Sequence, residues 1–166
     1  ILNDKKFGGT YLEKIVKDNV SGQMKIAPEH TMPHVLNLMG KQNIDMLLQF
    51  KNKFDEISKK AGKKQFLTYY LIAAHPGCNI KDMDALKEFT TQKLKMTPEQ
   101  VQIFTPSPST YSTLMYYTGL DPFSMTPIFV EKNPVNKEKQ KQIVTKKRAK
   151  QDYKTKKTYI KKPYKR

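Results

Sequence analysis

The stretch Gln65–Leu86, QFLTYYLIAAHPGCNIKDMDAL, decides the fold. It opens with a nearly continuous apolar and aromatic run from Phe66 to Ala74, which His75-Pro76-Gly77 interrupts before apolar residues resume at helical spacing. A run of this length between turn residues predicts a strand buried on both faces. A strand, a Pro-Gly turn and a helix form half of a parallel βαβ unit. Because ligands bind beyond the carboxyl ends of such strands, the turn after Ala74 is the first candidate for chemistry.

The rest of the chain continues the alternation of strands and helices. Shorter strands are predicted at 23–27 and 98–104, and an edge strand at 128–130; helices are predicted at 10–18, 31–39, 43–61, 81–95 and 111–118. This order predicts an α/β fold with three or four parallel strands. Three strands leave two unpaired edges, so we expect pairing with another part of the protein or with a second copy.

Positive charge is concentrated at one end of the 166-residue chain. The whole sequence carries a net charge of +16, and residues 137–166 alone contain 14 Lys or Arg against 2 Asp or Glu. Apart from a possible helical segment at 140–144, hydrophobic periodicity is lost there, which predicts a Lys-rich disordered tail. We therefore divide the chain into a body at 1–122, a linker or edge strand at 123–136 and a tail at 137–166.

The single cysteine, Cys78, excludes an intramolecular disulfide framework and any zinc site built from several cysteines. It fits a reducing compartment. No apolar run approaches the roughly 20 residues of a membrane-spanning helix, and no signal peptide is evident. We expect a cytoplasmic protein with no membrane partner. Since Ile1 leads directly into structured sequence, we also expect the chain to be the later part of a longer one.

Several segments together carry a resemblance to a known family. They are VSGQMKIAPEHT at 20–31, VLNLMGK at 35–41, AAHPGC at 73–78, EQVQIFTPSP at 99–108 and MYYTG at 115–119. In this combination the sequence resembles the radical S-adenosylmethionine (SAM) superfamily, and most closely its YgiQ-type proteins. The resemblance implies the C-terminal half of a partial (β/α)6 barrel that resembles a TIM barrel.

The resemblance also implies where SAM would bind. Glu29, after the first predicted strand, matches a residue that holds the ribose hydroxyls. Ile72, Ala74 and His75 match the segment whose backbone approaches adenine, although relatives often have glycine where this chain has alanine. Phe104, after the third strand, matches a position that flanks the adenine ring.

The superfamily's iron–sulfur cluster cannot be held by this chain alone. A [4Fe–4S] cluster needs several thiolates, which the family supplies from a CxxxCxxC loop, and this sequence has only Cys78. The resemblance therefore implies a SAM-facing wall, inactive alone, whose partner is the N-terminal half of the same protein. The complete enzyme would cleave SAM reductively to a 5′-deoxyadenosyl radical that acts on an unknown substrate.

Simpler interpretations of two of these residues stay open. The Glu29 carboxylate can hold ribose hydroxyls, but it can also cap a helix that starts near Thr31. His75 can contact a ligand, but a lone histidine at a strand end is more often a structural residue whose hydrogen bonds are satisfied.

Three further side chains have two interpretations each. Cys78 can be a reactive thiol at a helix N-terminus or a buried inert one. His30 and His34, four residues apart, can share a metal ion, but Pro33 lies between them and no third ligand is evident.

The Lys-rich tail supports an alternative function. Lysines neutralise phosphates without reading sequence, and Tyr153, Tyr159 and Tyr164 can stack on bases. The alternative is a nucleic-acid-binding module that contacts RNA or another polyanion through this tail. A solvated extension without a partner is the simpler interpretation of the same residues.

Overall fold

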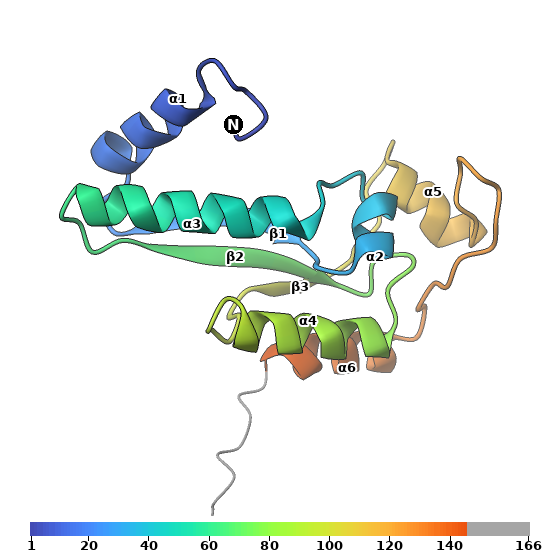
Figure 1. The fold of residues 1–166 in the computed structure, drawn as a ribbon. Coiled ribbons are helices and arrows are strands. Elements are labelled where there is room, and N and C mark those ends of the chain that lie inside the picture. Colours follow the sequence, from blue (N-terminus) through green and yellow to red (C-terminus); the bar gives the residue numbers. More distant parts are fainter. Residues whose placement is uncertain (146–166) are drawn as a thin grey trace, which may run out of the picture.

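A three-stranded parallel sheet lies at the centre of the computed structural model, which describes residues 1–145 (Figure 1). Its strands are β1 (Gln23–Glu29), β2 (Phe66–Ala73) and β3 (Val101–Ile103), in the order β1-β2-β3. The predicted α/β class and the three parallel strands are confirmed.

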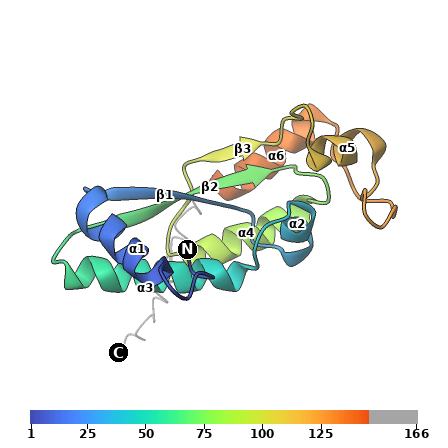
Figure 2. The ribbon, with the colours of Figure 1, turned by 90° about the horizontal axis from the view of Figure 1, so that it is seen from above.

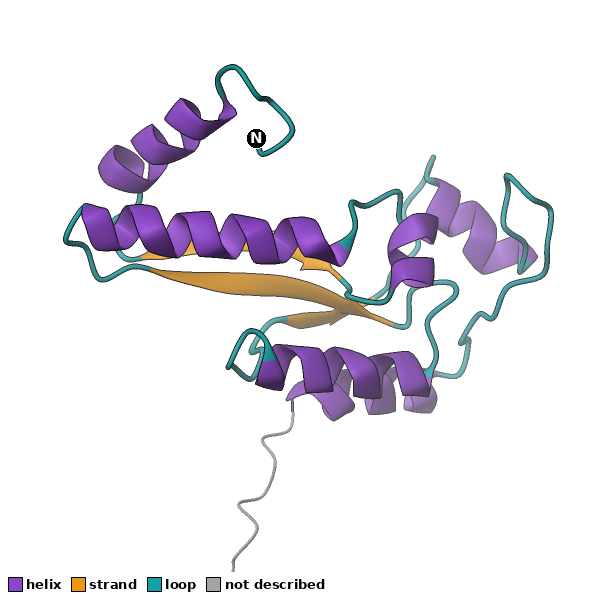
Figure 3. Ribbon diagram, viewed as in Figure 1, coloured by secondary structure: helices purple, strands orange, loops and turns teal. Residues whose placement is uncertain are grey.

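The described part of the chain also contains six α-helices (Figure 3). Before β1, α1 (Gly8–Lys14) continues into a π-helical segment, η1 (Ile15–Asn19). The crossover from β1 to β2 contains α2 (Pro33–Leu38) and α3 (Ile44–Lys60), and that from β2 to β3 contains α4 (Ile80–Gln92). Figures 1 and 2 together show α3 and α4 on the same side of the sheet. After β3 come α5 (Tyr111–Thr118) and α6 (Pro134–Thr145), and α6 packs against α4 and β3.

Two side-chain caps and one glycine define ends of three helices. The Asn43 side chain accepts a hydrogen bond from the amide of Asp45 at the start of α3. Asn79 and Asp82 form a reciprocal capping box at the start of α4. Gly119 ends α5 in the left-handed conformation that favours glycine.

The two faces of β2 differ, so the prediction of a strand buried on both faces is wrong. Leu67, Tyr69, Leu71 and Ala73 are buried and belong to the core that α3 and α4 complete. The alternate residues, Phe66, Thr68, Tyr70 and Ile72, are partly or fully exposed. No helix of residues 1–145 buries this second face, which we call the open face.

Polar side chains pair across the open face. The Gln23 amide donates to the Thr68 hydroxyl at 2.9 Å, which links β1 to β2. The Tyr70 hydroxyl donates to the Gln102 side chain, which links β2 to β3. The open face is therefore a hydrogen-bonded surface of mixed polarity rather than the apolar layer that the Phe66–Ala74 run predicts.

Two boundaries predicted for the C-terminal part need correction. Residues 128–130 form no strand: the amide of Ile128 donates to the Gly119 carbonyl, and the carbonyl of Phe129 accepts from the amide of Gly77. Residues 137–145 are not part of a disordered tail, because they belong to α6 and bury Gln140 and Val144. The remainder of the predicted tail lies outside the described residues. Within residues 1–145, no helix has the length and apolar character that crossing a membrane requires.

Candidate functional site at the carboxyl edge of the sheet

β1 ends in a distorted turn that displays Glu29. The register with β2 shifts between Ile26 and Glu29, so three residues of β1 span the distance of two on β2. Glu29 has φ = +66°. Its two neighbours are joined by a hydrogen bond, in which the amide of His30 donates to the carbonyl of Pro28 at 2.8 Å. A non-glycine residue in this conformation is strained. The Glu29 carboxylate lies 3.1 Å from the Lys41 ammonium.

β2 ends in a second strained residue. Ala74 is fully buried with φ = +57°. Its amide donates to Oε1 of Gln140 on α6 at 2.9 Å. Neighbouring strands therefore both end in non-glycine residues of positive φ, at the edge where parallel α/β sheets bind ligands.

His75 follows Ala74 and is buried, with both ring nitrogens partnered. Nδ1 donates to the Pro76 carbonyl and Nε2 accepts from the Ser112 hydroxyl, each at 2.8 Å. Burial lowers the pKa of His75 below its ordinary value, although the Pro76 carbonyl and the Glu29 charge oppose this shift. His75 is thus a neutral ring held in place on both sides, as the structural interpretation predicts.

Phe104 brings the third strand into the same edge. Its amide donates to the Ala73 carbonyl at 2.8 Å, which extends the pairing of β2 and β3. Its ring meets the His75 ring edge-on, with centroids 5.1 Å apart.

The structure therefore places the five predicted site residues within two residues of the carboxyl ends of three adjacent strands. Ile72 is half-buried on the open face of β2, two residues before Ala74. Glu29 does not cap the next helix, because the N-cap residue of α2 is Met32 and no side chain bonds there. The carboxylate pairs instead with Lys41, a partner that the sequence alone did not indicate.

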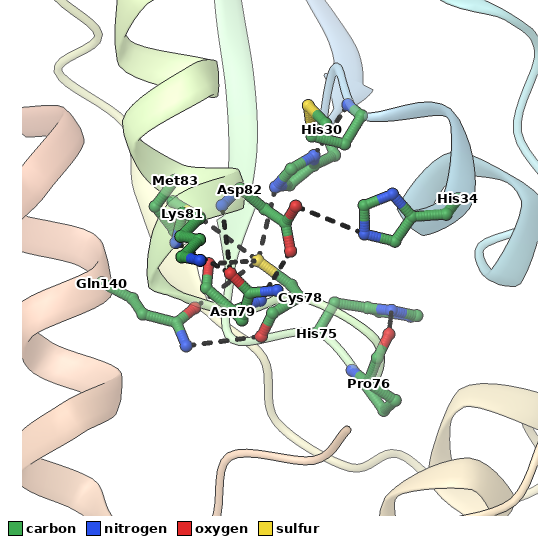
Figure 4. A network of polar contacts seen from close by, with 11 residues as sticks. His30, His34, His75, Pro76, Cys78, Asn79, Lys81, Asp82, Met83 and Gln140 are labelled. Atoms are coloured by element: carbon green, nitrogen blue, oxygen red, sulfur yellow. Dashed lines mark hydrogen bonds and ion pairs between the residues drawn. The ribbon is translucent and has the colours of Figure 1, made fainter. Parts of the chain in front are cut away.

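Beneath this edge, a buried polar network surrounds Cys78 (Figure 4). Nδ1 of His30 accepts from the amide of Met32, so Nε2 carries the proton and faces the Cys78 sulfur at 3.4 Å. Burial raises the pKa of the Cys78 thiol to about 12 and lowers the pKa of His30 to about 4, against the opposing charge of Asp82 on His30. At neutral pH this pair is an uncharged thiol and an uncharged imidazole, which favours the inert interpretation of Cys78.

His30 and His34 do not face a common metal position. His30 is directed at Cys78, whereas Nε2 of the exposed His34 lies 3.3 Å from the Asp82 carboxylate. In the part of the chain that the structure describes, no three His, Cys, Asp or Glu side chains converge to hold a metal ion.

Gln140 is the main contributor that sequence reasoning missed. Besides accepting from the Ala74 amide, its side chain donates to the Cys78 carbonyl at 3.4 Å, so one amide bridges both ends of the Ala74–Cys78 turn. One sequence signal could have indicated that Gln140 is buried. It is an uncharged residue among lysines, and it lies four residues before Val144, on the same helical face.

A cavity of about 350 Å³ lies beside Glu29, between β1, α2, α3 and the first residues of the chain. Its lining is mostly apolar, with polar groups from Lys41 and His30. The carboxyl edge of β1 thus adjoins a hollow, although Glu29 itself does not line it.

Comparisons with known proteins agree on one group. A UPF0313 protein of Fusobacterium nucleatum is 62% identical over 148 residues, which cover 89% of this chain and 26% of that protein. The chain is similar to UPF0313 proteins. Those of Clostridium perfringens and Thermotoga petrophila are 42% and 41% identical over 81% of this chain, and 20% and 24% of their own lengths. The chain thus spans about a quarter of the length of the UPF0313 relatives it matches.

A family model described as "Domain of unknown function (DUF3362)" matches residues 99–161. This segment contains β3, α5 and α6, and so includes both Phe104 and Gln140. No solved structure gives a significant match to the chain.

Proposed function

We propose that this chain is the SAM-facing wall of a radical SAM iron–sulfur enzyme of the YgiQ type, and forms the C-terminal half of its partial (β/α)6 barrel. The observation that carries the proposal is the pair of strained residues, Glu29 and Ala74, at the carboxyl ends of neighbouring strands. Strain at non-glycine residues is costly, at about 1–3 kcal/mol each, and concentrates at ligand sites.

The side chains around these two residues fit a nucleoside with a positively charged sulfonium group. Glu29 offers carboxylate oxygens to ribose hydroxyls, and its negative charge suits a cationic ligand. Phe104 offers an aromatic surface for adenine, and the His75 ring holds that surface edge-on. Ile72 is half-buried on the open face of β2 and can contact a planar base, whereas the fully buried Ala74 would shape the turn behind it.

This chain does not fit the cluster. Its one thiol is buried, has a pKa of about 12 and already contacts His30, so it is not a thiolate ligand. In the complete enzyme, the cluster and SAM together would supply a 5′-deoxyadenosyl radical for hydrogen abstraction. The residues described here would bind and orient SAM and keep water from it.

The sheet itself supports a partner within the same polypeptide. In residues 1–145 the outer edge of β1 has no paired strand, and the open face carries the Gln23–Thr68 and Tyr70–Gln102 pairs. A polar, hydrogen-bonded face is the kind that lines the interior of a barrel enclosing a charged cofactor. The preceding part of a longer protein, consistent with the length of the UPF0313 relatives, would complete the barrel; pairing of that edge with a second copy is the alternative.

SAM binding tests the proposed wall. In a chimera, this chain replaces the matching segment of the F. nucleatum UPF0313 protein, and binding of radiolabelled SAM is measured by equilibrium dialysis without oxygen. Glu29→Gln should weaken binding about tenfold, as expected for a lost charged hydrogen bond. The matched control is Glu13→Gln on α1, whose carboxylate forms a surface ion pair with Lys17. Equal SAM affinity of the Glu29 variant and the unsubstituted chimera would contradict the proposal.

Nucleic-acid binding through the Lys-rich end is a second candidate function. The observation that favours it is the net charge of +16, of which residues 137–166 carry +12. Binding to the phosphates of RNA should weaken steeply as salt rises. If removal of residues 146–166 leaves the affinity for RNA unchanged, the tail is not the binding segment.

A further inference from the structure

Exposed aromatic rings gather on α5 and the loop that follows it. Of the twelve large apolar side chains that are exposed in the described part of the chain, seven lie between positions 111 and 135. The most exposed are Phe123, Tyr117, Met125 and Tyr111, with between 63% and 76% of each residue accessible. Tyr111 and Phe123 lie ring to ring, with centroids 4.9 Å apart.

A chain of ring contacts joins this surface to the carboxyl edge of the sheet. From the buried His75 it passes through Phe104 and Tyr116 to the exposed Tyr117, with successive centroids 5.1, 5.8 and 5.4 Å apart. Both views show α5 projecting from the end of the sheet where β2 and β3 finish (Figures 1 and 2). The rings thus extend outward from the proposed SAM wall.

Two lysines lie over the half-buried Tyr116 ring, which contacts the exposed Tyr117. Nζ of Lys137 lies 4.6 Å from the centre of the Tyr116 ring and donates to its hydroxyl at 2.8 Å, and Nζ of Lys132 lies 5.9 Å from the same ring. The acidic residues nearby are engaged locally: Asp121 accepts from the amide of Phe123 and the hydroxyl of Ser124, and Glu131 accepts from the amide of Asn133. These bonds leave both carboxylates charged, so Lys132 and Lys137 balance the acidic residues here, and the excess of positive charge comes from the sequence of residues 137–166 as a whole.

We propose that this surface, formed by Tyr111, Tyr117, Phe123, Lys132 and Lys137, binds single-stranded nucleic acid. Exposed rings stack on bases of any sequence, and adjacent lysines contact the phosphates between them. The +12 charge of residues 137–166, which begin on α6 beside these rings, complements the same polyanion. An apolar protein partner would not use the lysines over Tyr116, so we favour nucleic acid.

We do not propose the serine- and threonine-rich turn at 105–110 as an anion-binding site. The Thr113 hydroxyl donates to the Ser107 carbonyl at 2.6 Å, and the Thr110 oxygen accepts from the amide of Thr113. These local bonds account for the hydroxyls at the start of α5, so the rings and lysines carry the proposal.

Fluorescence anisotropy with the full chain and labelled strands of about 12 nucleotides tests the surface. The probes are single-stranded RNA, single-stranded DNA, and an abasic strand with the same number of phosphates. Tyr117→Ala and Phe123→Ala should each weaken binding to the base-bearing strands about fivefold or more, because each ring lost removes one stacked base. Tyr117→Phe should bind as tightly as the original chain, since the ring is kept.

The controls distinguish binding through the aromatic rings from binding through the charge of the Lys-rich tail, and they are independent of the proposed SAM site. Tyr11→Ala removes an exposed tyrosine from α1, away from this surface, and should change nothing. Binding to the abasic strand, which reports the Lys-rich tail, should be the same in every variant. Three results would each overturn the proposal. They are equal binding of the base-bearing strands by Tyr117→Ala and the original chain, an affinity of the original chain for the abasic strand equal to that for the base-bearing strands, and self-association that the same alanines abolish. None of these measurements uses SAM or a cluster, so failure here leaves the wall proposal standing, and the reverse also holds.

Discussion

The amide of Ala74 donates a 2.9 Å hydrogen bond to the side chain of Gln140, which lies 66 positions later on α6. Gln140 is fully buried, and Ala74 is one of the two strained residues at the carboxyl edge. Helix α6 thereby fixes the turn that carries His75, and the segment matched by the DUF3362 description takes part in the candidate site.

Replacement of this amide should destabilise the fold. Gln140→Leu keeps the approximate volume but leaves the buried Ala74 amide without a partner, so the free energy of unfolding in urea should fall by about 1–3 kcal/mol. Gln142→Leu is the matched control, since among residues 1–145 the Gln142 side chain bonds only to Glu138 on the same helix, and it should stay within about 0.5 kcal/mol. Hydrogen exchange at Ala74 should also quicken in the Gln140 variant. If both variants are equally stable, the hydrogen bond between Ala74 and Gln140 contributes nothing to the free energy of unfolding.

A side chain at position 77 should lower the free energy of unfolding, for two separable reasons. Its φ is +86°, and a Cβ added there would lie 2.3 Å from Cδ1 of Leu38. Gly40 has a φ of +65° but open space around it, so Gly40→Ala measures the backbone cost alone, about 1 kcal/mol. Gly77→Ala should cost about 1 kcal/mol more, because the flexible end of the Leu38 side chain must move to make room.

A double-mutant cycle checks that division. Leu38→Ala should recover much of the additional loss in the Gly77→Ala background, because it removes the clashing methyl group, but not the backbone cost. Strictly additive losses for the two substitutions would show that the turn relaxes away from α2 instead.

Stability should fall on acidification through the buried His30. The folded state lowers its pKa from an ordinary 6.5 to about 4, chiefly because burial disfavours the charged ring. Between these two pH values the unfolded chain binds a proton that the folded chain does not, so the free energy of unfolding decreases as pH falls. The loss should be on the order of 3 kcal/mol and complete below pH 4. The lowered pKa of His75 acts in the same direction.

Urea unfolding at successive pH values measures this dependence. His30→Gln should flatten the decrease between pH 6.5 and pH 4, whereas His34→Gln on the exposed side of α2 should leave it in place. An unchanged slope in the His30 variant would assign the acid sensitivity to other groups.

Local sequence signals predicted most of the fold. The alternation of strands and helices depends on residues close together in the chain, and the predicted helices at 43–61 and 111–118 agree closely with α3 and α5. The carboxyl-edge placement of Glu29, His75 and Phe104 followed from strand order.

The predictions that failed concern burial and pairing, which depend on residues far apart in the sequence. Thr68, Tyr70 and Ile72 sit within an apolar run, yet they lie on a face that no helix of residues 1–145 buries. The lysines of α6 suggested an exposed segment, so the burial of Gln140 and Val144 was not predicted. Gln140 is buried because it bonds to Ala74 after β2, a tertiary contact that the local sequence does not indicate. Ile128–Val130 has strand-like residues, but its backbone bonds to Gly119 and Gly77 rather than to a strand.

The most direct test of the central claim is reductive cleavage of SAM by the chimera of this chain with the F. nucleatum UPF0313 protein. After anaerobic reconstitution with iron and sulfide, addition of dithionite and SAM should yield 5′-deoxyadenosine and methionine in equal amounts, measured by liquid chromatography. This chain alone, treated identically, should bind no cluster and yield neither product, since its only thiol is Cys78. A chimera that assembles no cluster, or that assembles one and leaves SAM intact, would contradict the account.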